Sequence, residues 1–374
     1  MIELKEICKV QCGFAFDSKK FTEDSSYYPL IRIRDVKRGF TQTYYTGEFS
    51  SEYIVHKGDL LVGMDGEFNI ARWNSDDALL NQRVCRIITN NNTNEEYLRF
   101  YLKRTLKLIE SKTSFVTVKH LSAKDLNRLK LNLPCIEDQQ RISKQLSTLE
   151  LMIRKNKQVL ELLDELVKAR FVEMFGDPIE NQKNWQIVKI RDIVTDVRYG
   201  TSKPAVEGGK YPYLRMNNLT VDGGLDLSDL KYIDIPDNEI EKCVVRKGDI
   251  LFNRTNSIDL IGKTAVFNLL DDMVIAGYII RIRLNDQILP DVFSQYMNLE
   301  AMKKVLKGMA KGAVNQANIN AQELQSIKVY IPDMELQKQY VEFKEEIDKS
   351  RSRIQKSLEA SQELFDSLMQ EYFG

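Results

Sequence analysis

The chain repeats part of its own sequence, and this repeat limits the fold more than any other feature. His56–Leu61 reads HKGDLL, and Arg246–Leu251 reads RKGDIL at an offset of 190 positions. Upstream, Tyr28–Arg32 (YPLIR) matches Tyr211–Arg215 (YPYLR). A sequence that repeats at this scale builds the same supersecondary unit more than once. We therefore expect two similar globular domains within the 374 residues.

The offset between the two copies becomes constant in the second part of each copy. Leu133-Pro134 matches Ile331-Pro332 at an offset of 198, and Phe175-Gly176 matches Phe373-Gly374 at the same offset. The globular parts therefore differ in loop length, while the tail of each copy has kept its length. A tail of fixed length predicts an element whose length matters to the molecule.

Each tail has the pattern of a long helix. Residues 137–175 contain no Gly or Pro, and their apolar residues recur at alternating steps of four and three, which is a heptad pattern. Gly176 and then Pro178 follow, a common way for a helix to end. The second copy runs from about Glu335 to Phe373. The apolar stripes predict a coiled-coil core of Ile142, Leu146, Leu149, Ile153, Leu160, Leu163, Val167, Ile347, Ile354, Leu358, Phe365 and Leu368.

The order of the segments along the chain predicts how these helices pair. The first helix leaves the first domain and enters the second, and the second helix leaves the second domain. If the two helices pack on each other, they must run antiparallel. Polar residues interrupt both stripes, namely Asn156, Arg170, Lys344, Arg351 and Ser361. The alternative is that each helix packs separately on its own domain.

These patterns predict an α+β (α/β) fold with a pseudo-two-fold internal repeat. Two similar globular domains, each with short strands and short helices, are separated by two long helices that form an antiparallel coiled coil. The expected segments are a first globular domain at 1–136, a first spacer helix at 137–176, a second globular domain at 177–334 and a second spacer helix at 335–374.

Composition narrows the class of protein. Lys plus Arg and Asp plus Glu both number 54, so the net charge is zero and the chain is not a uniformly basic nucleic-acid binder. Its five cysteines are scattered, no secretory segment opens the chain, and no apolar run reaches the ~18 residues of a membrane span. We therefore expect a reduced, cytoplasmic protein that does not contact a membrane.

Residues for catalysis or metal binding are not found in any recognisable pattern. The chain has two histidines, and Cys8 and Cys12 lack a second cysteine pair. The GKT within Ile261–Thr264 lacks the glycines of a phosphate-binding loop. Asp237 and Asp291 follow prolines but lack a Glu-X-Lys sequence at a suitable distance. We expect no catalytic residue, no metal site and no cofactor in this chain.

Short polar clusters in the expected loops favour binding to DNA. Arg pairs with guanine and Asn or Gln with adenine in the major groove, whereas Lys, Ser and Thr suit phosphates. A single polar loop is usually only solvated, but these clusters recur at matching places in both copies. The candidate DNA-binding residues are Arg34, Lys37, Arg38, Arg72, Lys119, Arg215, Asn217, Asn218, Arg254, Thr255, Asn256, Lys311, Asn315, Gln316 and Asn318.

Taken together, the motifs resemble those of the specificity subunits of type I restriction–modification enzymes. The resemblance rests on the KGD and YP strand motifs above, on Val314–Pro332, and on the [LI]-P-X-X-E-X-Q-[QK] starts at Leu133–Gln140 and Ile331–Lys338. In that family such sequences end each target recognition domain and open each conserved spacer helix. The resemblance covers the whole chain, and its specificity lies in the ordered duplication of these motifs.

The resemblance implies a function in a larger complex. Each target recognition domain would read one half of a split, asymmetric site in double-stranded DNA, and Arg254 is expected to contact a base in one half-site. Two modification (methyltransferase) subunits would bind the helices, carry S-adenosylmethionine and flip the target adenine out of the stack. Restriction or motor subunits can join them. This chain would be the non-catalytic subunit of that methyltransferase and restriction endonuclease complex.

Three other functions are compatible with the residues. The first is a specificity subunit for a methylation-only or type II-like system. The second is a coiled-coil scaffold that binds protein rather than DNA, which the zero net charge supports. The third is an enzyme of a type without recognisable motifs.

Overall fold

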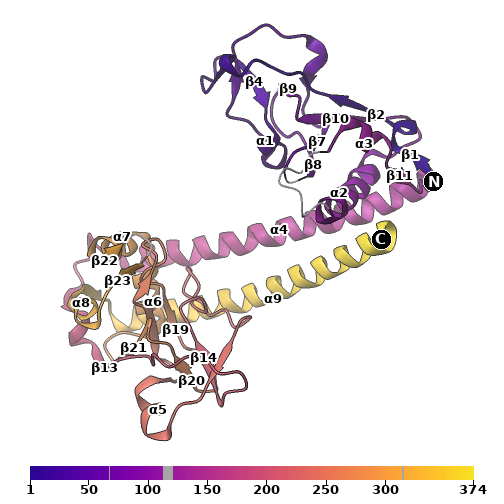
Figure 1. Cartoon of the computed structure of the whole chain (residues 1–374). Coiled ribbons are helices and arrows are strands. Elements are labelled where there is room, and N and C mark those ends of the chain that lie inside the picture. Colours follow the sequence, from indigo (N-terminus) through magenta and orange to yellow (C-terminus); the bar gives the residue numbers. More distant parts are fainter. Residues whose placement is uncertain (67, 113–120, 314–315) are drawn as a thin grey trace. The chain divides into compact units, whose positions relative to one another are not determined.

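The computed structural model divides into two compact units (Figure 1). It describes residues 1–66, 68–112, 121–313 and 316–374. The first unit holds Met1–Lys157 and Lys356–Gly374, and the second holds Gln158–Gln355. Each unit therefore contains one globular domain, part of helix α4 (Ile136–Phe175) and part of helix α9 (Met334–Phe373).

The two long helices have the same length, 40 residues each. Each begins one residue before the position expected from the sequence. Helix α4 ends where Gly176 adopts a φ of 84°, a left-handed conformation that is strained for residues with a side chain. Within the described ranges, no helix is both long enough and apolar enough to cross a membrane. The four-segment division of the chain stays a prediction.

In the first unit, the start of α4 pairs with the end of α9. The Tyr372 hydroxyl donates to Gln145 Oε1 at 3.2 Å, and Asn156 Nδ2 donates to Ser357 Oγ at 3.2 Å. The partner position on α9 moves back as α4 advances, so the helices are antiparallel. Their shared core with the first domain consists of Tyr97, Phe100, Ile142, Leu146, Ile153, Phe365 and Met369.

In the second unit, the end of α4 pairs with the start of α9 in the same way. Arg351 on α9 forms an ion pair with Asp164 on α4. The Phe171 and Tyr340 rings pack edge to face, with centroids 5.4 Å apart. Every residue of the predicted coiled-coil core is buried or half-buried. The antiparallel pairing is confirmed, and the alternative in which each helix packs only on its own domain is wrong.

The first globular domain is built around two small sheets. One has the order β2 (Cys8–Cys12), β10 (Val84–Thr89), β7 (Leu60–Gly63), β8 (Asn69–Arg72). The other has the order β3 (Phe21–Thr22), β5 (Tyr44–Tyr45), β4 (Tyr28–Ile31), β9 (Ala78–Leu80), β6 (Ile54–Val55), with β4 and β9 parallel. Strand β1 (Ile2–Glu3) pairs with β11 (Lys130–Leu131). The helices are η1 (Leu4–Glu6), η2 (Ser18–Lys20), α1 (Ile33–Arg38), η3 (Ser51–Tyr53), α2 (Glu95–Lys112) and α3 (Ala123–Asn127).

The second globular domain repeats these pairings. Its sheets have the orders β13 (Val194–Tyr199), β21 (Ile279–Leu284), β17 (Ile250–Asn253), β19 (Thr264–Val266), and β15 (Lys231–Ile233), β14 (Tyr211–Leu214), β20 (Met273–Ile275), β16 (Val244–Val245). Strand β12 (Gln186–Lys189) pairs with β24 (Lys328–Ile331), and β18 (Thr255–Asn256), β23 (Gln316–Asn318) and β22 (Lys311–Ala313) form a third small sheet. The helices are η4 (Ile190–Asp192), α5 (Asp237–Cys243), α6 (Pro290–Asn298), α7 (Glu300–Met309) and α8 (Ala321–Ser326). The expected repeat of two mixed α and β domains is confirmed.

The repeated KGD motif forms a turn that leads into a central strand. In the first copy, Asp59 Oδ2 accepts from the His56 backbone N–H and from Arg86 Nη1, both at 2.9 Å. Gly58 has a φ of 99°, which only glycine adopts without strain. The aspartate therefore holds the turn and ties it to β10.

The second copy of the motif makes the same turn, although the residues around it differ. Asp249 accepts from the Arg246 backbone N–H and from Arg283 Nε on β21, both at 2.9 Å, and Gly248 has a φ of 92°. The motif recurs because the same turn is needed twice. In both copies its aspartate holds the turn and ties it to the neighbouring strand.

A buried glutamine at the start of each long helix fixes the helix to its domain. Gln139 donates to the proline carbonyl that precedes α4 at 2.8 Å, and its Oε1 accepts from the Asn94 backbone N–H at 2.8 Å. Its counterpart Gln337 makes the same two bonds at the start of α9, with the Leu289 backbone N–H as the second partner. The shared L/I-P-X-X-E-X-Q motif is therefore a joint between domain and helix.

The paired helices predict the behaviour of half the chain. A chain that ends after Gln182 keeps the first domain and α4 but loses Phe365 and Met369, which cover Ile142 and Leu146. Exposing each such side chain costs roughly 1.5–3 kcal/mol. The repeat counterparts of the lost residues are Val167 and Phe171, so the end of α4 from a second copy can replace α9. We expect an antiparallel dimer in sedimentation; a folded monomer at micromolar concentration would contradict this pairing.

Candidate nucleic-acid interface

Five candidate DNA-binding residues of the second domain lie together on one small sheet, namely Thr255, Asn256, Lys311, Gln316 and Asn318. Thr255 and Asn256 form β18, and the antiparallel register pairs Thr255 with Asn318 on β23. Lys311 begins β22 and also pairs with Asn318 across the β22–β23 ladder. Arg254 immediately precedes β18. Residues more than 50 positions apart in sequence are thus brought into direct contact.

The Arg254 guanidinium is held by groups of the protein itself. Its Nη1 donates to the Gly277 carbonyl at 3.2 Å, and its Nη2 donates to Asn318 Oδ1 at 2.9 Å. The Tyr199 ring lies beneath it, with 4.9 Å between the guanidinium carbon and the ring centroid. The expectation that Arg254 itself contacts a base stays untested, but this geometry favours a positioning role.

The remaining residues of this sheet differ in how accessible they are. Asn256 is half-buried, and its amide donates to Asn253 Oδ1 at 2.9 Å. Gln316 is exposed on β23. Lys311 is exposed and forms an ion pair with Glu323, which lowers the pKa of that carboxyl. Asn315 lies outside the described residues.

The second predicted cluster of this domain follows strand β14. Arg215 pairs with Asp229 at 2.7 Å, and its backbone N–H donates to Asn218 Oδ1 at 2.8 Å. Asn218 is 2% exposed, and its amide donates to the Asp226 carbonyl. It therefore holds the turn, whereas the neighbouring Asn217 is exposed.

In the first domain, the expected polar loop after β4 is instead helix α1. Arg34, Lys37 and Arg38 lie on this helix and are exposed. The loop expectation was wrong because Asp35 accepts from the Arg32 backbone N–H at 2.8 Å and so caps the helix start. A helix of six residues is too short to show a period in sequence.

An open polar cleft of about 710 Å³ lies beside this helix. Arg32, Arg34 and Gln42 line it together with Tyr44. Arg32 was not among the predicted residues, although its repeat counterpart Arg215 was. Aligning the two copies residue by residue could have found it.

Arg72, a further first-domain candidate, does not line this cleft. Arg72 forms ion pairs with Glu95 and Glu96 at the start of α2, both at 2.5 Å, and donates to the Gly58 carbonyl at 2.7 Å. It ties β8 to α2. Lys119 lies outside the described residues.

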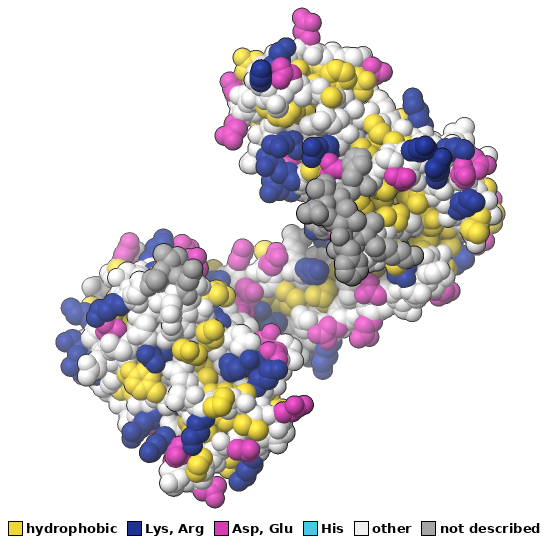
Figure 2. Space-filling view, viewed as in Figure 1, with side chains coloured by type: hydrophobic (Ala, Val, Ile, Leu, Met, Phe, Trp, Pro, Cys, Tyr) yellow, Lys and Arg dark blue, Asp and Glu magenta, His cyan; other side chains and the backbone are white. Residues whose placement is uncertain are grey.

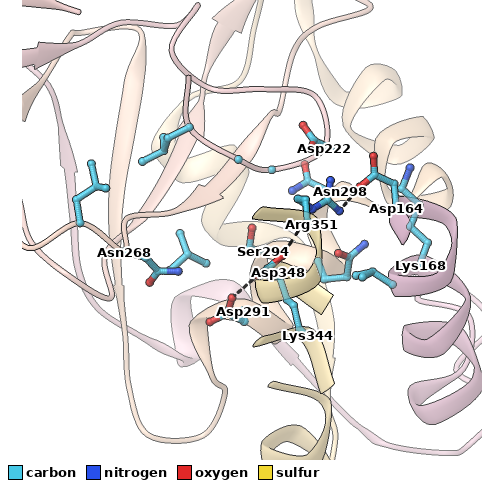
Figure 3. A pocket seen from close by; sticks show the side chains of 17 residues that line it. Asp164, Lys168, Asp222, Asn268, Asp291, Ser294, Asn298, Lys344, Asp348 and Arg351 are labelled. Carbon is cyan, nitrogen blue, oxygen red and sulfur yellow. Dashed lines mark hydrogen bonds and ion pairs between the residues drawn. The ribbon is translucent and has the colours of Figure 1, made fainter. Parts of the chain in front are cut away.

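The second unit also contains a charged cavity of about 290 Å³ beside the two long helices (Figure 3). Lys344 on α9 pairs with Asp291 on α6 at 2.8 Å and with Asp348 at 3.2 Å. Arg351 pairs with Asp164, as one of the dashed lines in Figure 3 marks. Two of the polar exceptions in the second stripe, Lys344 and Arg351, thus form ion pairs that join α9 to the domain and to α4, and Asp291 is part of this network.

Two sequence features that could suggest a metal or nucleotide site can be compared with the part of the chain that the structure describes. Residues 1–66, 68–112, 121–313 and 316–374 contain no group of three or more His, Cys, Asp or Glu placed to hold a metal ion. The lysine of the GKT sequence, Lys263, is 6% exposed and donates to the carbonyls of Met216 and Leu219. Its amine is used inside the fold rather than aimed at a phosphate.

Positively charged side chains are distributed over the surface in small groups among negatively charged ones. Figure 2 shows Lys and Arg side chains in dark blue on the visible face of both globular domains, interspersed with Asp and Glu in magenta. This distribution agrees with the zero net charge of the chain. Affinity for a polyanion would therefore depend on a few placed side chains.

Comparison with known proteins decides the family. A family model described as type I restriction modification DNA specificity domain matches residues 1–165 and 182–362. The chain belongs to this family. The EcoBI specificity subunit of Escherichia coli is 30% identical, over 96% of this chain and 81% of that protein. The MjaVIII specificity subunit of Methanocaldococcus jannaschii is 23% identical, over 87% and 80%.

Solved structures of type I specificity subunits share the fold. The S subunit from M. genitalium superposes with a TM-score of 0.64 at 15% identity, covering 100% of this chain and 95% of that chain. A chain from a study of the assembly and conformational transition of the type I R-M system gives a TM-score of 0.55 at 18% identity, covering 100% and 96%. The family resemblance expected from the repeated motifs is confirmed.

Sequence reasoning missed two members of the second-domain cluster. Tyr199 supports Arg254 from the end of β13, and the Gly277 carbonyl accepts from it. Neither belongs to a polar run, and both are more than 20 positions from Arg254. A repeat of sequence carries no signal for contacts that only one copy makes.

A half-buried lysine beside the GKT sequence predicts a pH dependence of stability. Lys303 Nζ donates to the Gly262 carbonyl at 2.5 Å; burial, and then the charge of Lys263, lower its pKa from 10.5 to about 7. Between these values the unfolded chain binds more protons than the folded chain, so the free energy of unfolding should rise with pH above 7.

Urea unfolding at several pH values measures this effect. Lys303→Met should make the dependence on pH above 7 flatter. Lys304→Met, at an exposed neighbouring position, should leave it unchanged. Equal pH dependence in Lys303→Met and the unmodified chain would show that this amine titrates as an ordinary lysine.

Proposed function

We propose that the chain is the DNA specificity subunit of a type I restriction–modification complex. Each target recognition domain reads one half of a split, asymmetric site in double-stranded DNA, and the paired helices set the unread gap between the halves. The observation that carries this proposal is the duplication of one domain on two helices of identical length. Two domains that share a fold but differ in sequence are suited to bind two half-sites that differ in sequence.

The modification subunits are proposed to dock on the outer face of helix α4. In the second unit this face exposes Val159, Leu162 and Leu166, each 37–53% exposed. They follow one another at steps of three and four, so they lie along one side of the helix. An exposed apolar row of this kind on a long helix marks a surface that a partner covers.

A double substitution tests this docking surface. Leu162→Glu with Leu166→Glu places two charges on the exposed row without touching the buried seam. Binding of the modification subunits should weaken by about tenfold or more, since desolvating an unpaired charge costs several kcal/mol. Leu270→Glu, at a residue 89% exposed in a loop of the second domain, is the matched control. Equal affinity of both variants, measured by calorimetry, would remove α4 from the interface.

The chemistry is proposed to reside in the partner subunits. The modification subunits would carry S-adenosylmethionine and transfer its methyl group to an adenine that they flip out of the duplex. This chain's residues would bind and orient the DNA so that the target base meets a partner active site. Motor and nuclease subunits would join the same complex.

Reconstitution with labelled cofactor tests the proposal. The chain alone and the modification subunits alone should each transfer no label to specific DNA, whereas the complex should transfer it. Methyl transfer by the isolated chain would show that it is an enzyme. Binding of the modification subunits without any gain in DNA specificity would instead favour a protein-binding scaffold.

A further inference from the structure

We propose that Asn318 reads a hydrogen-bond acceptor on a base, and that Arg254 and Thr255 position it for that purpose. The proposal rests on the function proposed above and names the kind of contact that the second domain makes. It also changes the role expected for Arg254, from a side chain that reads a base to one that orients the reader.

The carbonyl oxygen of the Asn318 side chain is already fully used. It accepts from Arg254 Nη2 and from Thr255 Oγ1, both at 2.9 Å. Because a guanidinium only donates, the atom that faces Arg254 must be the oxygen of the amide and not its nitrogen. An amide oxygen has two lone pairs, and these two donors occupy both.

Arg254 is itself fixed, so it can hold the amide in one orientation. Its other terminal nitrogen donates to the Gly277 carbonyl, and its guanidinium lies over the Tyr199 ring. The Tyr199 hydroxyl in turn accepts from the Ala321 backbone N–H at the start of α8, at 2.8 Å. The chain of contacts runs from helix α8 through Tyr199 and Arg254 to Asn318 on β23.

The amide nitrogen of Asn318 is the part that remains available. Asn318 is half-buried at the end of β23, and its Nδ2 donates to no acceptor among the described residues. The exposed side chain of Gln316 lies on the same strand. A fixed donor at the end of the central strand of this small sheet is preorganised for a ligand acceptor, because little orientational freedom is lost on binding.

This geometry limits which base Asn318 can read. The usual asparagine–adenine pair needs both amide atoms, the oxygen for adenine N6–H and the nitrogen for N7. With the oxygen occupied, only donation remains. In the major groove, the acceptors are guanine N7 and O6, adenine N7 and thymine O4, whereas cytosine presents an amino donor. Asn318 should therefore donate a hydrogen bond to guanine, adenine or thymine at one position of the site, and should discriminate against cytosine there.

Binding of DNA duplexes to the complex with modification subunits tests the inference. The probe set changes each base of the site in turn, and replaces each purine with its 7-deaza form, which lacks the N7 acceptor. With the wild-type chain in the complex, cytosine at one position in one half-site should lower the DNA affinity by about fivefold to tenfold. This is the effect of one neutral hydrogen bond. Loss of affinity on 7-deaza substitution at that position would identify N7 as the acceptor. If affinity is unchanged, the acceptor is a base carbonyl oxygen, and the duplexes with each base in turn show whether it is guanine O6 or thymine O4.

Three variants separate reading from positioning. Asn318→Ala should abolish the discrimination at that position alone. Thr255→Val and Arg254→Met should reduce it at the same position, because the amide is then free to turn, while discrimination elsewhere stays. Asn238→Ala, at an exposed position on α5, is the control and should change nothing. Thr255→Val keeps the shape of the side chain and removes only its hydroxyl. It therefore still tests the positioning role if the Arg254→Met chain does not fold.

Two results would overturn the inference while leaving the proposed function intact. One is a uniform loss of affinity for all duplexes in Asn318→Ala, which identifies a phosphate contact. The other is an Asn318→Ala complex with unchanged discrimination at every position. If the unmodified complex itself shows no sequence preference, the proposed function fails, and this inference fails with it.

Discussion

The burial of one apolar stripe between α4 and α9 is the contact on which the rest of the structure depends. Within each unit, the start of one helix packs against the end of the other and against its own domain. Phe100 of α2 meets Phe365 of α9 with ring centroids 6.0 Å apart in the first unit, and Tyr296 of α6 meets Phe171 of α4 at 6.4 Å in the second. The same seam therefore pairs the helices and seats each domain on them.

The features that sequence could predict are those that many residues encode together. The heptad stripe extends over most of both helices, so single exceptions such as Asn156 or Arg351 did not hide it. The helix ends were predicted to within one residue, and for α4 the reason is that Gly176 and Pro178 are physical stops. Duplication of the KGD turn and of the glutamine joint then revealed two copies of one domain.

The parts of the site that sequence could not predict depend on contacts between distant residues. Arg72, Arg215 and Arg254 look equally available in sequence, yet each is held by the fold, and their partners are 14 to 64 positions away. Asn217 and Asn218 are adjacent, but one is exposed and the other is buried in a turn. A polar cluster locates a site without telling which of its members face solvent.

The central claim is that two copies of one domain read two separate half-sites. Mapping every adenine methylated by the reconstituted complex on random-sequence DNA tests it most directly, together with a chain whose second domain is exchanged for that of a relative. We expect two short defined segments separated by an undefined gap of constant length, and a change in one segment only after the exchange. A single continuous recognition sequence, or a change in both segments, would contradict it.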